Sequence, residues 1–472
     1  MAGTFISGKT KIRPGTYYNI QKYKSNAPEG SINGVTAAVF RSDFGPVGKV
    51  LELHPEDGYE AVFGTALTAD VIKEVFAGGA NTVLACRLGT GGSQAGVTLK
   101  GTVGDGAEAD AVKITAKYPG EKSFTVTVRD QLTDDTLREC IIHTGTSVFE
   151  RVEFAAGEKE AQALAEAFSS SVNFTAEVLK SCEEAVMSAV SQEQFVSGSN
   201  PEVTNESYSD AFAVLEQYEF NSICVDTENT AVHLLLQSFM DRIFNAGSLA
   251  QAVVAEKHTV SLEKREAHAA AFNDEKMNYV LNAYVSEQGT EIDGYQTAAR
   301  IAGMIGAVNS GTTLTHTVID GFSELLERLT NTQITEAEKN GCIVLSLNSE
   351  RQVWIDNAIN TLTVPADNQD DGWKKIRRVK TRFELIRRVN DATDKLKVDN
   401  DSNGRATVMS RISGVGGKMI TEGKLNECKV TESSIYKADG DSAWFDIGVI
   451  DKDSMEHIYL TYLFRFNTNI KN

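Results

Sequence analysis

The spacing of hydrophobic positions changes several times along this chain, and each change predicts a different kind of structure. Continuous apolar runs at 34–40 and 81–88 are typical of buried strands, and residues 68–79 between them have helical spacing with a threonine N-cap. Beyond the glycine-rich stretch 89–96 the spacing falls to two, which favours antiparallel strands separated by turns. Residues 97–200 are therefore predicted to form an inserted β-rich module.

Strand and helix patterns alternate between 208 and 308, which predicts parallel strands with right-handed crossovers in a doubly wound βα layer. Residues 312–454 mix both patterns. They contain two helices within 320–341, longer helices at about 370–396 and 405–422, and closing strands. We therefore expect a multidomain protein of the α/β plus α+β class.

A chain of 472 residues is too long for one ordinary hydrophobic core, so several units are expected. The predicted units are an N-terminal arm at 1–30, a first core part at 31–96, the inserted module at 97–200, a βα-repeat domain at 201–311, a C-terminal α+β domain at 312–454, and a C-terminal strand with a linking arm at 455–472.

The segment 455–466 (MEHIYLTYLFRF) alternates in a way that predicts a strand with two largely apolar faces. Burying five such side chains is worth at most about 10 kcal/mol, whereas chain ends normally fray. The strand must be hidden within the chain or used for assembly, and we favour assembly. An open alternative is that Ile458 to Leu463 pair within the chain while Phe464 onward crosses to the next subunit.

Charge and composition exclude several classes of function. With 46 basic and 65 acidic residues the net charge is -19, which opposes direct binding to nucleic acid. No apolar run is long enough to span a membrane, and residues 1–15 lack the hydrophobic core of a secretory signal. Six scattered cysteines without a C-x-x-C pair fit a reducing cytoplasm better than a disulfide framework or a zinc site.

No motif for catalysis, cofactor binding or metal binding stands out. The glycine-rich stretches 89–96 and 413–418 lack the spacing of a phosphate-binding loop, and the seven histidines form no metal or catalytic pattern. Residues 399–410 place acidic side chains as in a calcium loop, but Ser410 stands where a bidentate glutamate is required. A polar turn between two helices is the favoured interpretation, with weak calcium binding as the alternative.

The segment 373–388 is unusually basic for an acidic chain. It carries eight cations against the single acid Glu384, a local charge of +7. Its apolar residues recur at helical spacing, so one face is predicted to pack on the domain while the other displays the cations. Either this is a solvated face, or it docks an acidic partner. The apolar residues are Trp373, Ile376, Val379, Phe383 and Ile386.

Several segments together resemble the tail sheath protein of contractile bacteriophages and phage-tail-like bacteriocins. They are 34–53, 329–345, 353–364, 399–405 and 451–464, in addition to the basic helix. The resemblance implies a structural subunit with no active site and no cofactor. Such subunits form a helical polymer of stacked rings around an inner tail tube, and the polymer contracts to drive the tube through a cell envelope. The chain would be made in the bacterial cytoplasm and end up in a virion tail or a released tail-like particle.

The resemblance also implies roles for particular residues. Family members link subunits through terminal arms that add strands to a neighbour's sheet, and they hold the tube through a helix of the C-terminal domain. The linking strands would include Tyr17, Tyr18, Ile20, Ile458, Leu460, Tyr462, Phe464 and Phe466. The tube-binding residues would come from Lys374, Lys375, Arg377, Arg378, Lys380 and Arg382.

Further partners would be baseplate and tail terminator proteins, with no nucleic acid bound directly and no membrane insertion. Two alternatives are a non-contractile tail or baseplate component, and a Rossmann-like enzyme built on the βα region. Clustered titratable groups in a pocket at the strand ends would favour the enzyme.

Overall fold

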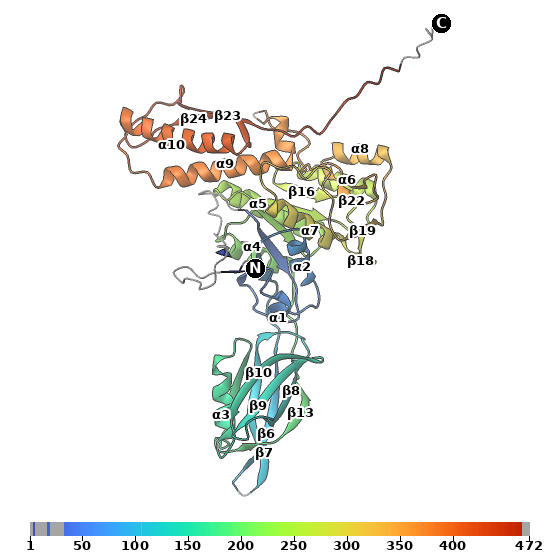
Figure 1. The fold of residues 1–472 in the computed structure, drawn as a ribbon, viewed down its shortest axis with the longest axis vertical. Helices are drawn as coiled ribbons and strands as arrows, with labels where there is room; N and C mark the ends of the chain where they lie inside the picture. Colours follow the sequence, from blue (N-terminus) through green and yellow to red (C-terminus); the bar gives the residue numbers. More distant parts are fainter. Residues whose placement is uncertain (1–2, 5–16, 19–32, 105, 368, 465–472) are drawn as a thin grey trace.

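The computed structural model describes residues 3–4, 17–18, 33–104, 106–367 and 369–464. Three parts follow one another along the long axis in Figure 1. A β-rich part lies at one end, a layer of sheet and helices in the middle, and a pair of long helices at the other end. The molecule is a mixed α/β protein of several parts, as the hydrophobic spacing predicted.

The middle part is built on a seven-stranded sheet with the order β20-β16-β15-β14-β3-β5-β4. Neighbouring strands run parallel, except that the edge strand β4 is antiparallel to β5. The inner strands are buried on both faces, which explains their continuous apolar runs. The strands are β3 (Val35–Phe40), β4 (Val50–Leu53), β5 (Thr82–Arg87), β14 (Ser222–Val225), β15 (Gln251–Ala255), β16 (Met277–Val280) and β20 (Cys342–Ile343).

Helices cover both faces of this sheet. On one face α2 crosses α7 so closely that a Cβ on Gly303 would lie 2.1 Å from the carbonyl oxygen of Val75. The two helices therefore touch through their backbones, which only glycine permits. The helices of this face are α1 (Tyr59–Phe63), α2 (Asp70–Ala77) and α7 (Gly294–Ala307). Those of the opposite face are α4 (Asn205–Leu215), α5 (Thr230–Asn245), α6 (Leu262–Phe272) and α8 (Asn331–Lys339).

The β-rich part, called the β-module below, consists of strands β6 to β13 with their own hydrophobic core. Its alternating sequence places every second side chain inside. One sheet has the order β11-β7-β6-β12 and the other β10-β9-β8-β13. The elements are β6 (Gln94–Val103), β7 (Ala107–Pro119), β8 (Thr125–Asp130), β9 (Leu137–Thr144), β10 (Ser147–Ala155), α3 (Glu160–Ala167), η1 (Phe168–Ser170), β11 (Phe174–Val178), β12 (Val186–Met187) and β13 (Val190–Gln194).

The joint between the β-module and the central sheet is closely packed. Phe44, from the loop after β3, is buried in the core of the β-module. The buried guanidinium of Arg87, at the end of β5, donates to the carbonyl oxygens of Ser42, Gly45 and Pro119 at 2.6 to 3.0 Å. The glycine-rich stretch is also structured, because its backbone pairs with the returning chain at Thr90↔Glu202 and Ser93↔Ser199.

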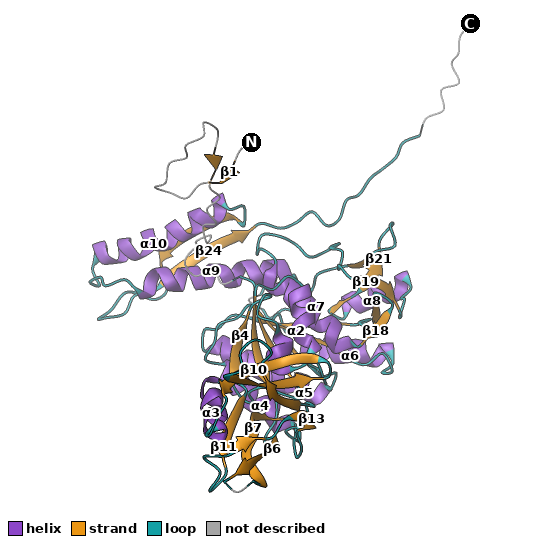
Figure 2. Cartoon of the chain, turned by 60° about the horizontal axis from the view of Figure 1, so that its bottom comes forward, coloured by secondary structure: helices purple, strands orange, loops and turns teal. Residues whose placement is uncertain are grey.

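The C-terminal part packs α9 (Ile376–Asp394) beside α10 (Ser402–Thr421), and a two-stranded antiparallel sheet accompanies them. Figure 2 shows α9 and α10 with β24 beside them. The sheet consists of β23 (Leu425–Glu432) and β24 (Phe445–Asp451), and the 3-10 turn η2 (Asp371–Lys374) precedes α9. Smaller strands are β17 (Val285–Glu287), β18 (Thr290–Ile292), β19 (Phe322–Leu325), β21 (Leu345–Leu347) and β22 (Val353–Ile355).

One predicted helix is wrong. Residues 322–325, expected to be helical, form strand β19, because the edge of β17 is available to pair with them. The second predicted helix of that segment is confirmed as α8, where Thr330 and Gln333 form a capping box. At the N-terminus, β1 (Gly3–Thr4) pairs in parallel with β2 (Tyr17–Tyr18), whereas Ile20 lies outside the described residues.

Candidate functional site

The C-terminal arm, residues 452–464, follows β24, and the end of it extends away from the body in both views (Figures 1 and 2). Its alternating side chains Ile458, Leu460, Tyr462 and Phe464 are 67 to 93% exposed. No strand is assigned to the arm, so pairing of Ile458 to Leu463 within the chain is wrong for the described residues. Phe466 lies beyond them.

The sheet of β23 and β24 offers unpaired edges. Among the described strands each pairs only with the other, which leaves one edge of each open. A groove of about 600 Å³ runs between α9 and β24. Its apolar lining includes Leu385, Ile386, Val389, Ile447 and Val449. Ile386 was predicted to pack on the domain, but its side chain lies half exposed in this groove.

The remaining apolar face of α9 packs as predicted. Ile376, Val379 and Phe383 are buried, and Phe383 contacts the ring of Trp373 with the centroids 6.4 Å apart. Val379 and Phe383 join Leu249 of the central part in one cluster. The hydrophobic spacing of this segment therefore identified the helix and three of its packing residues.

The prediction that the other face of α9 displays cations is wrong. None of the eight basic residues between 373 and 388 is exposed. Arg378 and Arg382 both pair with Asp451, at 2.6 and 2.9 Å, and Lys374 pairs with Asp371 at 3.1 Å. Asp370, just before this segment, also pairs with Arg382 at 2.9 Å. Asp451, in contrast, lies about seventy positions further along the chain, so local spacing gave no sign of it.

Several of these cations bind backbone carbonyls instead of acids. The buried ammonium of Lys380 donates to Ile305, Gly306 and Val308 at the C-terminal end of α7. Such carbonyls have no partner within their helix and favour a cation. Burial still lowers the pKa of Lys380 to about 7. Arg377 donates to the carbonyl oxygen of Gly311 at 2.9 Å, so α9 is fastened to the chain that follows α7.

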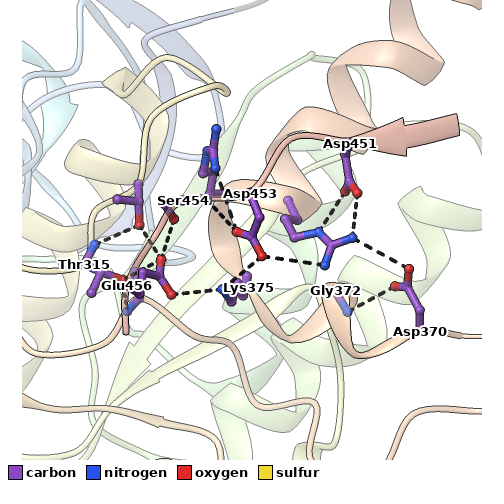
Figure 3. A network of polar contacts seen from close by, with 12 residues as sticks. Thr315, Asp370, Gly372, Lys375, Asp451, Asp453, Ser454 and Glu456 are labelled. Atoms are coloured by element: carbon purple, nitrogen blue, oxygen red, sulfur yellow. Dashed lines mark hydrogen bonds and ion pairs between the residues drawn. The ribbon is translucent and has the colours of Figure 1, made fainter. Parts of the chain in front are cut away.

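A polar network holds the segment where the arm begins (Figure 3). Lys375 Nζ lies 3.0 Å from a carboxylate oxygen of Asp453 and 3.0 Å from one of Glu456. Burial alone would raise the pKa of Asp453 and of Glu456. The hydrogen bond and charge of Lys375 lower the pKa of Asp453 below its usual value, and the hydroxyl of Ser454 together with Lys375 does the same for Glu456. The pKa of Asp451 is likewise lowered, against the effect of burial, by Arg378 and Arg382.

A crevice of about 450 Å³ opens at the carboxyl ends of the parallel strands, between β3 and β14. Strand order reverses there, which is where open α/β sheets bind ligands. The buried carboxylate of Asp226 accepts from Arg41 Nε at 2.7 Å, from Tyr208 at 2.6 Å, and from Thr68. Thr68 was predicted to cap α2, but Ala69 holds that position. These three donors occupy the oxygens of Asp226. The carboxylate therefore holds neighbouring segments together and is not free to act as a base.

The segment with calcium-loop spacing begins α10. The side chain of Asp401 accepts from the backbone N–H of Gly404 at 2.7 Å and so caps the helix. Across the described residues, no group of three or more His, Cys, Asp or Glu side chains is placed to hold a metal ion. In the same residues no helix is both long and apolar enough to cross a membrane.

Comparison with known families bears on whether this fold is that of a sheath protein or of an enzyme. Residues 201–361, about a third of the chain, match the family model described as the phage tail sheath protein central domain. The resemblance to tail sheath proteins is confirmed. This family is a structural one and not an enzyme family.

Solved structures share the fold over nearly the whole chain. The sheath tail protein DSY3957 from Desulfitobacterium hafniense has a TM-score of 0.70 at 18% identity, covering 93% of this chain and 100% of its own. The helical sheath of the anti-feeding prophage in its contracted state has a TM-score of 0.55 at 10% identity, covering 96% and 99%. The uncharacterized protein YqbK of Bacillus subtilis (strain 168) is 23% identical over 412 residues, 84% of this chain and 82% of its own.

Sequence reasoning missed the acids that organise the C-terminal part of the fold. Asp451, Asp453 and Glu456 precede the conspicuous apolar alternation and resemble an ordinary polar turn. Their only signal was an unexplained excess of cations in 373–388, since buried or half-buried cations need acidic partners somewhere in the chain.

Proposed function

We propose that this protein is the structural subunit of a contractile tail sheath. Copies would polymerise helically around an inner tube and contract to drive that tube through a target cell envelope. The observation that carries the proposal is the match between an unpaired apolar arm and an unpaired strand edge on the same chain. Each feature lacks a partner within the described residues. The open edge can pair with an extended segment, and the arm is such a segment.

The proposed link is strand addition. Ile458, Leu460, Tyr462 and Phe464 of one copy would extend along the open edge of β24 in another, with alternate side chains entering the groove over α9. Burying four such side chains is worth at most about 8 kcal/mol, at about 2 kcal/mol each. Main-chain pairing also survives large rotations of the bodies that it joins, which a contracting lattice needs.

The first experiment removes the arm. A chain that ends before Met455 is expected to remain folded by circular dichroism but to form no long sheaths in negative-stain micrographs. Sheaths of normal length from this truncated chain would rule out strand addition by the C-terminal arm. Full-length protein that never forms hollow tubes or helical sleeves would instead favour a non-contractile tail or baseplate component.

The second experiment blocks the groove with a matched control. Ile386→Glu places a charge in the groove, whereas Ile420→Glu places the same charge on α10 outside the lining of the groove. The two side chains are 38 and 40% exposed, so both variants should fold. Only Ile386→Glu is expected to prevent polymerisation. Equal assembly of the two variants would mean that the groove is not the acceptor.

The tube contact remains a prediction. Lys374, Lys375, Arg377, Arg378, Lys380 and Arg382 already have partners within the chain, so binding a tube through them requires exchange of existing ion pairs. Lys374 is the most accessible among those in ion pairs, with 35% of its side chain exposed, and its partner Asp371 is 85% exposed. The terminal strands at Tyr17, Tyr18 and Ile20, and contacts with baseplate and terminator proteins, belong to the same proposal.

A further inference from the structure

The C-terminal arm loses its contacts with the body after Glu456. The Glu456 side chain is 10% exposed, whereas Met455 before it is 82% exposed and Ile458 after it is 67% exposed, so Glu456 is the last side chain of the arm that is turned into the body. From His457 to Phe464 no hydrogen bond or ion pair joins the arm to the described part of the body, while every acid from Asp451 to Glu456 has at least one. The boundary between held and free chain therefore lies between residues 456 and 457.

The held segment, Asp451 to Glu456, is called the arm root below. At its start Asp451 is buried between Arg378 and Arg382, and the backbone N–H of Lys452 donates to the carbonyl oxygen of Lys424 at 3.0 Å. At its end Glu456 accepts from Lys375 and from the hydroxyls of Thr313 and Ser454. Figure 3 shows Asp453 and Glu456 both turned toward Lys375.

These partners come from two different parts of the molecule. Lys375 precedes α9, whereas Thr313 lies in the chain between α7 and β19. The arm root is thus fixed across both and not merely attached to the strand that precedes it. Contacts at two ends fix a direction as well as a position.

We propose that the basic residues before and within α9 form an electrostatic clamp on the arm root, so that the linking arm hinges after Glu456 and leaves every copy in one direction. This role of Lys375, Arg378 and Arg382 goes beyond strand addition and rests on it only for its effect on assembly. The clamp accounts for Lys375, Arg378 and Arg382 without an external partner, because the arm root supplies acids for all three.

The clamp has a physical consequence for linking. The eight residues from 457 to 464 reach at most about 26 Å when extended. Releasing the root at Lys452 would add five residues, or about 16 Å, and would let the arm point in many directions. The effective concentration of the arm at a neighbour's open edge falls as that volume grows. A clamped root therefore favours addition to one particular neighbour.

The clamp is tested in monomers, so that the result does not depend on assembly. A dye attached at His457→Cys, in a Cys428→Ser background because the other five cysteines are buried, reports local motion at nanomolar concentration. The residual anisotropy is expected to be high in the otherwise unchanged chain and about twofold lower after Lys375→Gln. A dye at Phe464→Cys is expected to move freely in both.

Lys374→Gln is the matched control. It removes the same charge from the neighbouring residue, whose partner is the exposed Asp371 and not the arm root. It is expected to leave the anisotropy at residue 457 unchanged. The clamp would be overturned if the anisotropy at residue 457 were the same in Lys375→Gln as in the unchanged chain. It would also be overturned if Lys374→Gln and Lys375→Gln lowered that anisotropy equally. In polymerisation assays Lys375→Gln is expected to raise the critical concentration about tenfold. Failure of strand addition would leave the monomer measurement intact.

Discussion

The ring of Phe44, from the loop that follows β3, packs edge to face on Phe124 of the β-module with the centroids 5.2 Å apart. Phe149 and Tyr118 contact the same ring. An aromatic side chain of the central part thus completes a core that otherwise belongs to the β-module, and the two parts share part of their stability.

Phe44→Ala is therefore expected to lower the free energy of unfolding of the β-module by about 3 to 5 kcal/mol, because it leaves a cavity among aromatic rings. Differential scanning calorimetry of the variant should show a lower melting temperature for the part that contains β6 to β13. A β-module that melts unchanged in Phe44→Ala would mean that its core is independent of the central part.

Two glycine substitutions should have opposite effects on stability. Gly303→Ala places a methyl group 2.1 Å from the carbonyl oxygen of Val75, so α2 and α7 must move apart at a cost of about 1 to 3 kcal/mol or more. Gly414→Ala lies on α10 with nothing within 4 Å of the new methyl group, and it should gain up to about 1 kcal/mol. Urea titrations of both variants measure the difference.

The carboxyl group of Glu338, at the end of α8, should make stability fall as the pH rises. Burial, followed by the charge of Asp356, raises its pKa to about 7 from an ordinary value of 4.5, against a weak hydrogen bond from Asn357. The folded chain therefore prefers the protonated acid, so its penalty is absent below about pH 4.5 and complete above about pH 7.

Glu338→Gln is accordingly expected to stabilise the chain by roughly 1 kcal/mol at pH 8, after allowance for partial exposure to solvent, and to have little effect at pH 4. Chemical unfolding at the two pH values tests this. A variant that gains the same stability at both would show that the carboxyl pair does not control the difference.

The sequence predicted what depends on local spacing. The alternation at Ile458, Leu460, Tyr462 and Phe464 identified the arm, and the helical spacing of Ile376, Val379 and Phe383 identified α9 with its packing face. Strand β19 was missed because Phe322 and Leu325 are three positions apart, which is helical spacing, and the β17 edge that pairs with them is not visible from the local sequence. Asp451, the partner that Arg378 and Arg382 share on the arm side, was missed because it is distant in the chain.

The two crossings between the central part and the β-module lie against each other, paired at Thr90↔Glu202 and Ser93↔Ser199. The entire outer portion is thus attached by a single stalk whose entry and exit points coincide. Such a stalk allows one outer portion to be grafted in place of another without rerouting the chain beneath it. The graft would have to keep an aromatic pocket for Phe44 and a carbonyl for Arg87, among the contacts of the joint, while the rest of this end of the molecule could change without altering the central part.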